Sequence, residues 1–218
     1  MNILRVITLM LAFADTSLAS ASATDDFFKA VRIDDVRAVR ALIARDFDPN
    51  TADAAGDPGL IVAIRNDASK VAELLIADPK VDPDRTNASL ETPMMLAAHR
   101  NRKDLVEKLV ARGAEVNRKG WTALHYAASV GNVEIVKLLL DSSAYIDAES
   151  PNQTTPLMMA ARSKKREVCK LLIEEGADPS LINQRDLTAA DFALRAGDTE
   201  LAESLKKDAD AWRQKHPR

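Results

Sequence analysis

The chain has 218 residues, of which 46% are hydrophobic and 29% charged, and its formal net charge is −3. These proportions are typical of an ordinary folded domain and exclude a disordered or membrane-embedded chain, and the slightly acidic balance argues against a general nucleic-acid-binding protein. The single cysteine, Cys169, excludes an intramolecular disulfide and a multi-cysteine zinc site.

Residues 1–23 are predicted to form a secretory signal peptide. One positive side chain, Arg5, precedes a largely apolar run from Val6 to Ala14, and small residues follow it. Because the run is far shorter than the roughly 20 residues that span a bilayer, a membrane anchor is the weaker interpretation. We expect cleavage after Ala23, or alternatively after Ala19. The mature protein would then be exported, to the periplasm if the source is a Gram-negative bacterium, and would not insert into a membrane.

Residues 120–144 carry the pattern of one helix-turn-helix unit. Thr122 opens a short helix whose Ala127 and Ala128 are small enough to let a neighbouring helix lie close. Gly131 should break this helix, and Asn132 can cap the next one. In the second helix apolar residues recur at helical spacing, at Ile135, Val136, Leu138, Leu139 and Leu140. Two such helices cannot bury their apolar faces alone, so the unit needs copies stacked on it.

Copies of this unit recur along residues 25–212. The residues equivalent to Leu124 are separated by 33, 34, 30, 33 and 33 residues, and they are Phe27, Leu60, Met94, Leu124, Leu157 and Ala190. A motif close to T-P-L-H-x-A occupies residues 92–98, 122–128 and 155–161, and the turns that begin at Gly113 and Gly176 add to it. This pattern resembles the ankyrin repeat. The resemblance implies an all-α ankyrin-repeat solenoid of about six helix-turn-helix units with short β-turn fingers.

The predicted organisation is a signal peptide over 1–23, a repeat domain over 24–212 and a tail over 213–218. The units start near residues 25, 58, 92, 122, 155 and 188. The first replaces the opening motif with Asp26, Phe27 and Phe28, and the sixth ends in charged residues, as expected of caps at the two ends of an array. The short interval after Asn117 predicts one truncated finger.

Enzyme, cofactor and metal motifs are absent from the sequence. It contains no G-x-S-x-G, no glycine-rich phosphate loop, no H-E-x-x-H and no cysteine pair. His125 occupies the motif position whose role in ankyrin repeats is local hydrogen bonding, and His99 and His216 are isolated. Cys169 lies among apolar residues and is expected to be buried, with a regulatory or intermolecular thiol as the alternative. We therefore expect no catalysis, no cofactor and no metal site.

A row of mostly basic side chains lies five residues beyond each reference position. It consists of Arg32, Arg65, His99, Ser129, Arg162 and Arg195. The ankyrin resemblance implies that this position faces the concave side, where partners usually bind, and Arg100 and Trp121 should lie nearby. Arginines can offer forked donors to carboxylates or phosphates. The alternative is family habit, because arginine after two alanines is common in ankyrin repeats.

These observations predict an exported, non-catalytic protein–protein interaction module. It would bind, protect or regulate a periplasmic protein through its concave face and fingers. The alternatives are an immunity protein that neutralises a toxin and a self-associating structural protein of the envelope. The predicted protein-binding residues are Arg32, Arg65, His99, Arg100, Trp121, Arg162 and Arg195. If the basic row is functional, the partner should present acidic groups.

Overall fold

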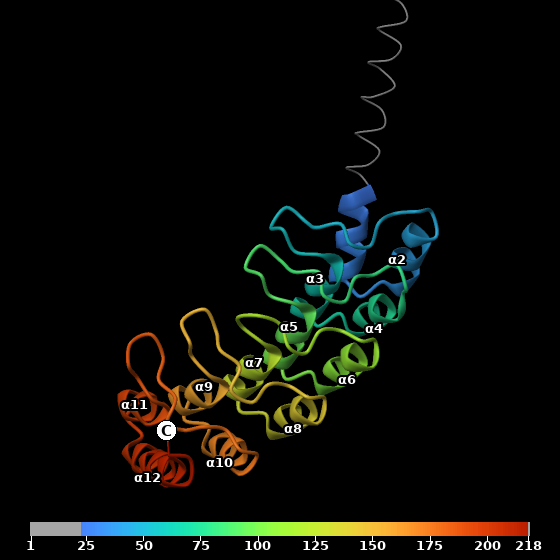
Figure 1. Ribbon diagram of the computed structural model, residues 1–218. Coiled ribbons are helices and arrows are strands. Elements are labelled where there is room, and N and C mark those ends of the chain that lie inside the picture. Colours follow the sequence, from blue (N-terminus) through green and yellow to red (C-terminus); the bar gives the residue numbers. More distant parts are fainter. Residues whose placement is uncertain (1–22, 218) are drawn as a thin grey trace, which may run out of the picture. The chain divides into compact units, whose positions relative to one another are not determined.

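The computed structural model describes residues 23–217, which form two compact units, one ending at Leu90 and the other beginning at Glu91. Within these residues the regular structure is helical apart from one isolated bridge between Ala52 and Pro58, which confirms the predicted all-α fold class (Figure 1). All but the last residue of the predicted signal peptide lies outside the described residues. Between residues 23 and 217, no helix combines the length and apolar character needed to cross a bilayer.

The first unit, hereafter unit 1, contains a helical stretch over residues 23–32 and the helices α2 (Val36–Ile43), α3 (Gly59–Arg65) and α4 (Ser69–Ala77). Helix α4 packs against α2 and α3. At the start of α3, a Cβ on Gly59 would lie 2.7 Å from the ring of Phe27, which is fully buried. The glycine at the first position of α3 therefore has a steric cause, because a larger residue there would force the ring of Phe27 to move.

The second unit, hereafter unit 2, contains four helix pairs. They are α5 (Pro93–His99) with α6 (Lys103–Ala111), α7 (Ala123–Val130) with α8 (Val133–Asp141), α9 (Pro156–Arg162) with α10 (Arg166–Glu174), and α11 (Ala189–Arg195) with α12 (Thr199–Lys215). Helices α5, α7, α9 and α11 pack side by side in chain order as an inner layer, and α6, α8 and α10 do so as an outer layer (Figure 1). Helix α12 packs on α11 and continues three residues past the expected domain end at Trp212.

The inner helices of unit 2 begin where the repeated threonines predict. The hydroxyls of Thr92, Thr155 and Thr188 accept hydrogen bonds from the backbone N–H three residues later, at 3.2, 3.4 and 3.3 Å. Proline follows the first two of these threonines at a helical position whose N–H would have no partner in the helix. The paired alanines at the centre of α5, α7 and α9 are fully buried, so the small side chains do allow close packing of neighbouring helices.

The turn between the paired helices is also as predicted in the fourth repeat. Gly131 ends α7 with φ +90°, and Asn132 caps α8 by accepting a 2.8 Å hydrogen bond from the N–H of Ile135. The residues equivalent to Gly131 also have positive φ in the other repeats, where they are Asp34, Asp67, Asn101, Lys164 and Gly197. Asparagine and aspartate tolerate this left-handed conformation better than most residues, so glycine is not required at every turn.

The fingers are short hairpins between successive repeats. Each of three is closed by a backbone hydrogen bond spanning four residues, from Asp53 to Asp57 at 2.9 Å, from Ser150 to Thr154 at 3.1 Å and from Asn183 to Leu187 at 3.0 Å. In the shortened finger, the side chain of Asn117 accepts from the N–H of Tyr145 and donates to the carbonyl of Ser143, both at 2.7 Å. Asn117 thus still bridges to the next repeat although the chain beyond it is cut short.

Candidate functional site

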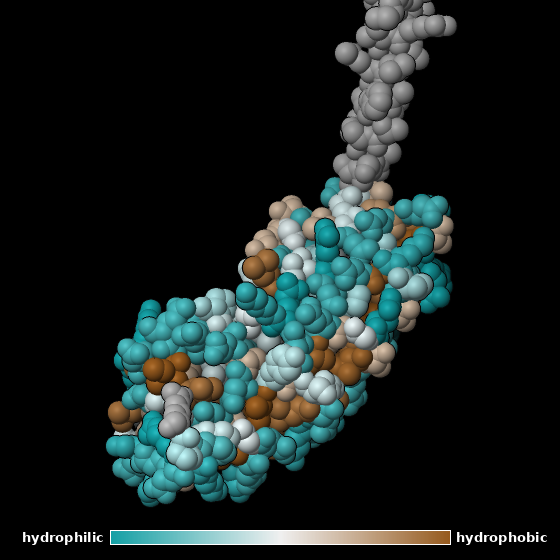
Figure 2. Space-filling model, viewed as in Figure 1, coloured by the Kyte–Doolittle hydropathy of each residue, from teal (hydrophilic) through white to brown (hydrophobic). Residues whose placement is uncertain are grey.

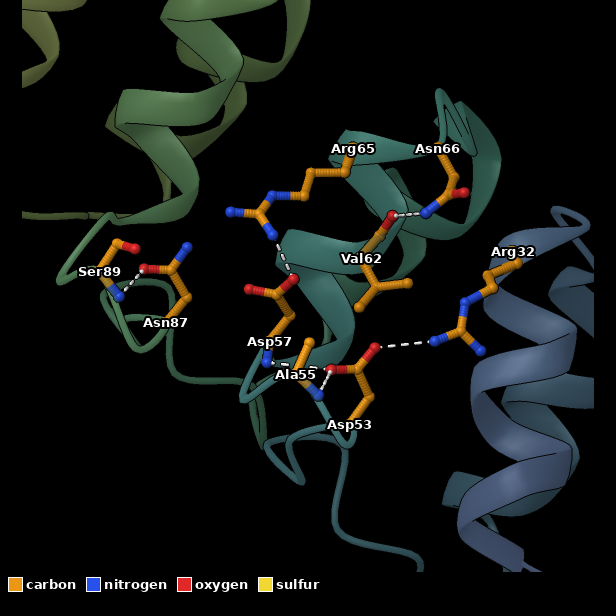
Figure 3. Close-up of polar contacts among 9 residues, drawn as sticks. All are labelled: Arg32, Asp53, Ala55, Asp57, Val62, Arg65, Asn66, Asn87 and Ser89. Atoms are coloured by element: carbon orange, nitrogen blue, oxygen red, sulfur yellow. Dashed lines mark hydrogen bonds and ion pairs between the residues drawn. The ribbon is translucent and has the colours of Figure 1, made fainter.

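The two arginines of the row in unit 1 are held by carboxylates of one finger (Figure 3). Arg32 pairs with Asp53 at 2.7 Å, and Arg65 pairs with Asp57. Asp53 also accepts from the N–H groups of Ala55 and Asp57, at 2.9 and 3.2 Å, so the carboxylate shapes the finger as well as binding the arginine. Asp57 is only 6% exposed. Arg32 and Arg65 therefore tie the finger to the inner helices, a role that sequence reasoning missed.

The middle members of the row lie in the first two repeats of unit 2. His99 is exposed and packs edge-on against the ring of Tyr126 with the centroids 5.8 Å apart, and Arg100 is exposed at the end of α5. The hydroxyl of Tyr126 donates to Glu91 at 3.2 Å, and burial raises the pKa of this tyrosine to about 12. Ser129 is half-buried and donates to the carbonyl of Tyr126 at 2.9 Å. Of these residues, His99 and Arg100 can reach a partner.

The last two members of the row are more available. Arg162 ends α9, Arg195 ends α11, and both are exposed. Among residues 23–217 no carboxylate lies within ion-pair distance, 4.0 Å, of either guanidinium. Arg195 does lower the pKa of the Asp191 carboxyl electrostatically, although hydrogen bonds from Thr188 are the larger cause of that shift. In unit 2 the row thus carries two arginines without an ion-paired partner in the described part of the chain.

Arg162 and Arg195 line one pocket of about 210 Å³ together with finger residues. Its other lining residues are Trp121, Asn152, Thr154, Asn183, Arg185, Leu187 and Phe192. Trp121, which the sequence placed near the row, is half-buried and lies edge-on to the ring of His125 at 5.1 Å. The pocket, hereafter the arginine pocket, therefore combines two predicted row residues, the predicted tryptophan and a third arginine that the sequence did not single out.

The remaining chemically notable side chains of unit 2 are buried within the packing. His125 is fully buried, its Nδ1 lies 2.9 Å from the hydroxyl of Thr122, and its Nε2 lies 2.9 Å from the carbonyl of Thr154 in the next repeat. Burial lowers the pKa of His125 to about 4. Cys169 is buried as predicted, and burial raises the pKa of its thiol to about 12. No cluster of three or more side chains suited to a metal ion occurs among residues 23–217.

The surface outside the arginine pocket carries both hydrophilic and hydrophobic residues. Figure 2 shows hydrophilic residues over most of the face that it presents, with hydrophobic residues in separate groups among them. Among residues 23–217, the exposed large hydrophobic residues are dispersed along the chain, at Ile33, Leu90, Tyr145, Ile182 and Leu194. Apolar residues scattered singly are normal on soluble proteins, so these positions do not by themselves mark an interface.

Comparison with known proteins gives a family match over most of the chain. A family model described as "Ankyrin repeats (3 copies)" matches residues 60–150 and 144–215. The chain is similar to neurogenic locus notch homolog protein 1 of Xenopus tropicalis, with 36% identity over 126 residues, covering 56% of this chain and 5% of that protein. It is also similar to Protein glp-1 of Caenorhabditis elegans, with 26% identity over 215 residues, covering 91% of this chain and 17% of that protein. The chain thus spans a small part of these curated relatives.

A solved structure resembles the chain over most of both lengths. It is a chain in the complex of the predatory endopeptidase Bd0816 of Bdellovibrio bacteriovorus with the immunity protein Bd3460. The TM-score is 0.72 and the sequence identity 26%, over 84% of this chain and 97% of that chain.

Proposed function

Because the chain belongs to the ankyrin-repeat family, whose members are in general non-catalytic interaction modules, we propose that it binds a partner protein through the inner-helix ends and fingers of unit 2. The observation that carries this proposal is the exposure of Arg162 and Arg195 without an ion-paired carboxylate in the described part of the chain. Arginine is enriched at protein interfaces and can bind carboxylates through two parallel hydrogen bonds. The partner should accordingly present an acidic segment.

The compartment is part of the same proposal. Residues 1–23 have the layout of a secretory signal, so the partner should be another exported protein, and the two would meet in the periplasm if the source is a Gram-negative bacterium. Binding would protect or regulate that protein. Long-range attraction between opposite charges speeds encounter and weakens with salt, so complex formation should slow as the ionic strength rises.

Neutralisation of an exported enzyme, as by an immunity protein, is the second candidate function. It is favoured by the likeness to a chain in the endopeptidase and immunity-protein complex, which extends over 97% of that chain. This candidate makes a narrower claim than binding alone. The partner would be an enzyme, and its activity would fall when the two proteins are mixed.

Affinity capture from the exported fraction of the source organism tests the first proposal. We expect one foreign protein in stoichiometric amount, and we expect the double charge reversal of Arg162→Glu and Arg195→Glu to lose it. The matched control is the double reversal of Arg37→Glu and Arg40→Glu, two exposed arginines of α2 in unit 1, which should retain the partner. Both variants should melt close to the parent, because surface substitutions usually change stability by only about 0.5 kcal/mol each.

The outcomes separate the candidates. Capture of further copies of this chain alone would contradict partner binding and favour self-association. If the double reversal of Arg162 and Arg195 retains the partner as tightly as the parent, the row reflects family habit and the interface lies on other residues. If a captured enzyme keeps full activity in the complex, neutralisation is rejected while binding stands.

A further inference from the structure

Three arginines supply hydrogen-bond donors to the arginine pocket. Arg162 and Arg195 come from the ends of two inner helices, and Arg185 comes from the tip of the last finger. A guanidinium has five N–H donors and no acceptor. None of the lining residues is acidic, so the positive charge of the three arginines is not offset by a carboxylate in the wall.

Two asparagines in the wall add further donors. The side-chain oxygen of Asn183 accepts from the N–H groups of Arg185 and Leu187, at 2.9 and 3.2 Å, and that of Asn152 accepts from the hydroxyl of Ser150 at 2.5 Å. The Asn183 oxygen thus has both lone pairs engaged, the Asn152 oxygen has one engaged, and the NH₂ groups of both amides can donate to a ligand. The pocket therefore offers donors from five side chains.

The fingers that carry these donors are joined to one another. The backbone N–H of Gln184 donates to the carbonyl of Asn152 at 3.2 Å, and its side-chain NH₂ donates to the carbonyl of Pro151 at 3.0 Å. A site whose supporting residues are fixed before binding loses less entropy when the ligand arrives. The rim of the pocket is thus partly ordered without a ligand.

In unit 1, two finger carboxylates neutralise the arginines of the row. At the equivalent positions around Arg162, the residues are uncharged. In unit 1, Asp57 lies eight residues before Arg65, and Asp53 lies 21 residues after Arg32. The residue eight before Arg162 is Thr154, and the residue 21 after it is Asn183. Both of these residues line the arginine pocket. The pocket is therefore the place where the repeat lacks its own carboxylates.

We propose that the arginine pocket binds the carboxylate of an aspartate or glutamate side chain that a partner protein inserts between the last two fingers. This inference rests on the proposed function and names the group that the partner supplies. The volume, about 210 Å³, lies below the range of about 300–1,000 Å³ that is usual for small-molecule sites, which fits one inserted side chain better than a whole metabolite. Trp121 and Phe192 supply apolar wall for the methylene part of that side chain.

Fluorescence titration with a hexaglutamate peptide tests the pocket directly. The chain has two tryptophans, so a Trp212→Phe background leaves Trp121, which lines the pocket, as the reporter. We expect hexaglutamate to change the Trp121 emission in a saturable and salt-sensitive manner, and hexaglutamine to have no such effect. The double variant Arg162→Gln and Arg195→Gln should bind at least about tenfold more weakly, the size of effect that follows from losing one charge-assisted hydrogen bond. The double variant Arg37→Gln and Arg40→Gln should bind like the parent.

Two further variants keep the test decisive if the glutamine variant is impaired in folding. Asn183→Asp is nearly isosteric, retains the oxygen that the N–H groups of Arg185 and Leu187 require, and introduces the carboxylate that unit 1 has. It should lose hexaglutamate binding while melting no lower than the parent. Arg162→Lys with Arg195→Lys keeps the charge but loses the forked donors, and it should bind more weakly than the parent.

Several results would overturn the assignment. One is equal binding of hexaglutamate by the parent and Asn183→Asp, and another is equal binding by the parent and the lysine variant. Displacement of hexaglutamate by an equal concentration of inorganic phosphate, or tighter binding of a short single-stranded DNA, would make the pocket a site for other anions. If a captured partner binds the Asn183→Asp protein undiminished, partner binding survives and the pocket is rejected. If no partner is captured but hexaglutamate binds as expected, the pocket survives and the proposed function fails.

Discussion

The buried histidine of the fourth repeat predicts a specific pH dependence of stability. His125 is fully buried, and its Nε2 lies 2.9 Å from the carbonyl of Thr154 in the fifth repeat. The N–H of Thr122 donates to its Nδ1 at 3.2 Å, so Nδ1 is the acceptor and Nε2 carries the hydrogen. Both ring nitrogens are therefore engaged in the neutral form, and the imidazolium form would carry its charge at a site shielded from water.

The direction and the size of the change in folding stability with pH follow from the pKa of His125. Burial lowers this pKa from 6.5 to about 4, so between these values the unfolded chain binds a proton that the folded chain does not. Stability from the neutral histidine is present above pH 6.5 and is lost as the pH falls toward 4. The full gap corresponds to about 3 kcal/mol, of which about 2 kcal/mol should be lost between pH 7.5 and pH 5.

Asp147 acts in the opposite direction over the same pH range. Burial raises the pKa of its carboxyl to about 6, above the usual 3.8, so the folded chain binds a proton first and gains stability as the pH falls through 6. The pH dependence of stability of the parent alone therefore contains opposite contributions from His125 and Asp147. The comparison of the parent with His125→Met isolates the histidine, because Asp147 is present in both proteins.

His125→Met is the matched variant because methionine occupies the same position in the third and fifth repeats. There the sulfurs of Met95 and Met158 accept from the threonine N–H at 3.4 Å. The variant should be less stable by about 1–3 kcal/mol at pH 7.5, because the carbonyl of Thr154 loses its donor. Urea denaturation at pH 7.5 and pH 5 should show a loss of unfolding free energy about 2 kcal/mol larger for the parent than for the variant. A difference under about 0.5 kcal/mol would contradict the neutral, buried state of His125.

Three further predictions test export, register and the ion pairs of unit 1. When the protein is expressed with its own N-terminus in a bacterium, mass spectrometry should show the loss of about 23 residues. Detection of protein that still begins with Met1 would contradict export. Leu139→Ala should cost roughly 2–5 kcal/mol in a denaturation assay, because Leu139 is fully buried in α8, and a cost below about 1 kcal/mol would refute the repeat register. Arg65→Gln should lower the unfolding free energy by about 1–3 kcal/mol, because the buried carboxylate of Asp57 loses its partner. Arg195→Gln should change it by only about 0.5 kcal/mol. Equal effects of the two substitutions would contradict the difference between the two units.

The local structure of the repeats could be predicted because the signals are local. Thr92 and Thr155 cap helices three residues away, and Gly131 ends α7 through its own backbone conformation. Burial of Cys169 and Leu139 followed from helical spacing alone. The extension of α12 to Lys215 was not expected from the sequence, which predicted a tail from residue 213.

The arginine pocket and the ion pairs of unit 1 could not be predicted because they depend on distant residues. Arg32 meets Asp53 across 21 positions, and the pocket joins Trp121 to Arg195 through two other fingers. The sequence placed Arg162 and Arg195 at equivalent positions but gave no sign of Arg185, which reaches the pocket through the turn that Asn183 holds. Side chains that meet across repeats are selected by packing, and a single sequence carries no record of that selection.

The arginine of the row recurs in several repeats, and its neighbours in each repeat determine where an acidic partner can bind. In unit 1 such a partner would have to displace Asp53 from Arg32 or Asp57 from Arg65, and the displaced carboxylate of the buried Asp57 would be left without its partner, at a cost of about 1–3 kcal/mol. Around Arg162 the equivalent positions are Thr154 and Asn183, so a partner's carboxylate displaces no carboxylate of the chain. The same arginine position therefore stabilises the finger in unit 1 and remains available in unit 2. The property that separates the two roles is the charge of the neighbouring finger rather than the arginine itself.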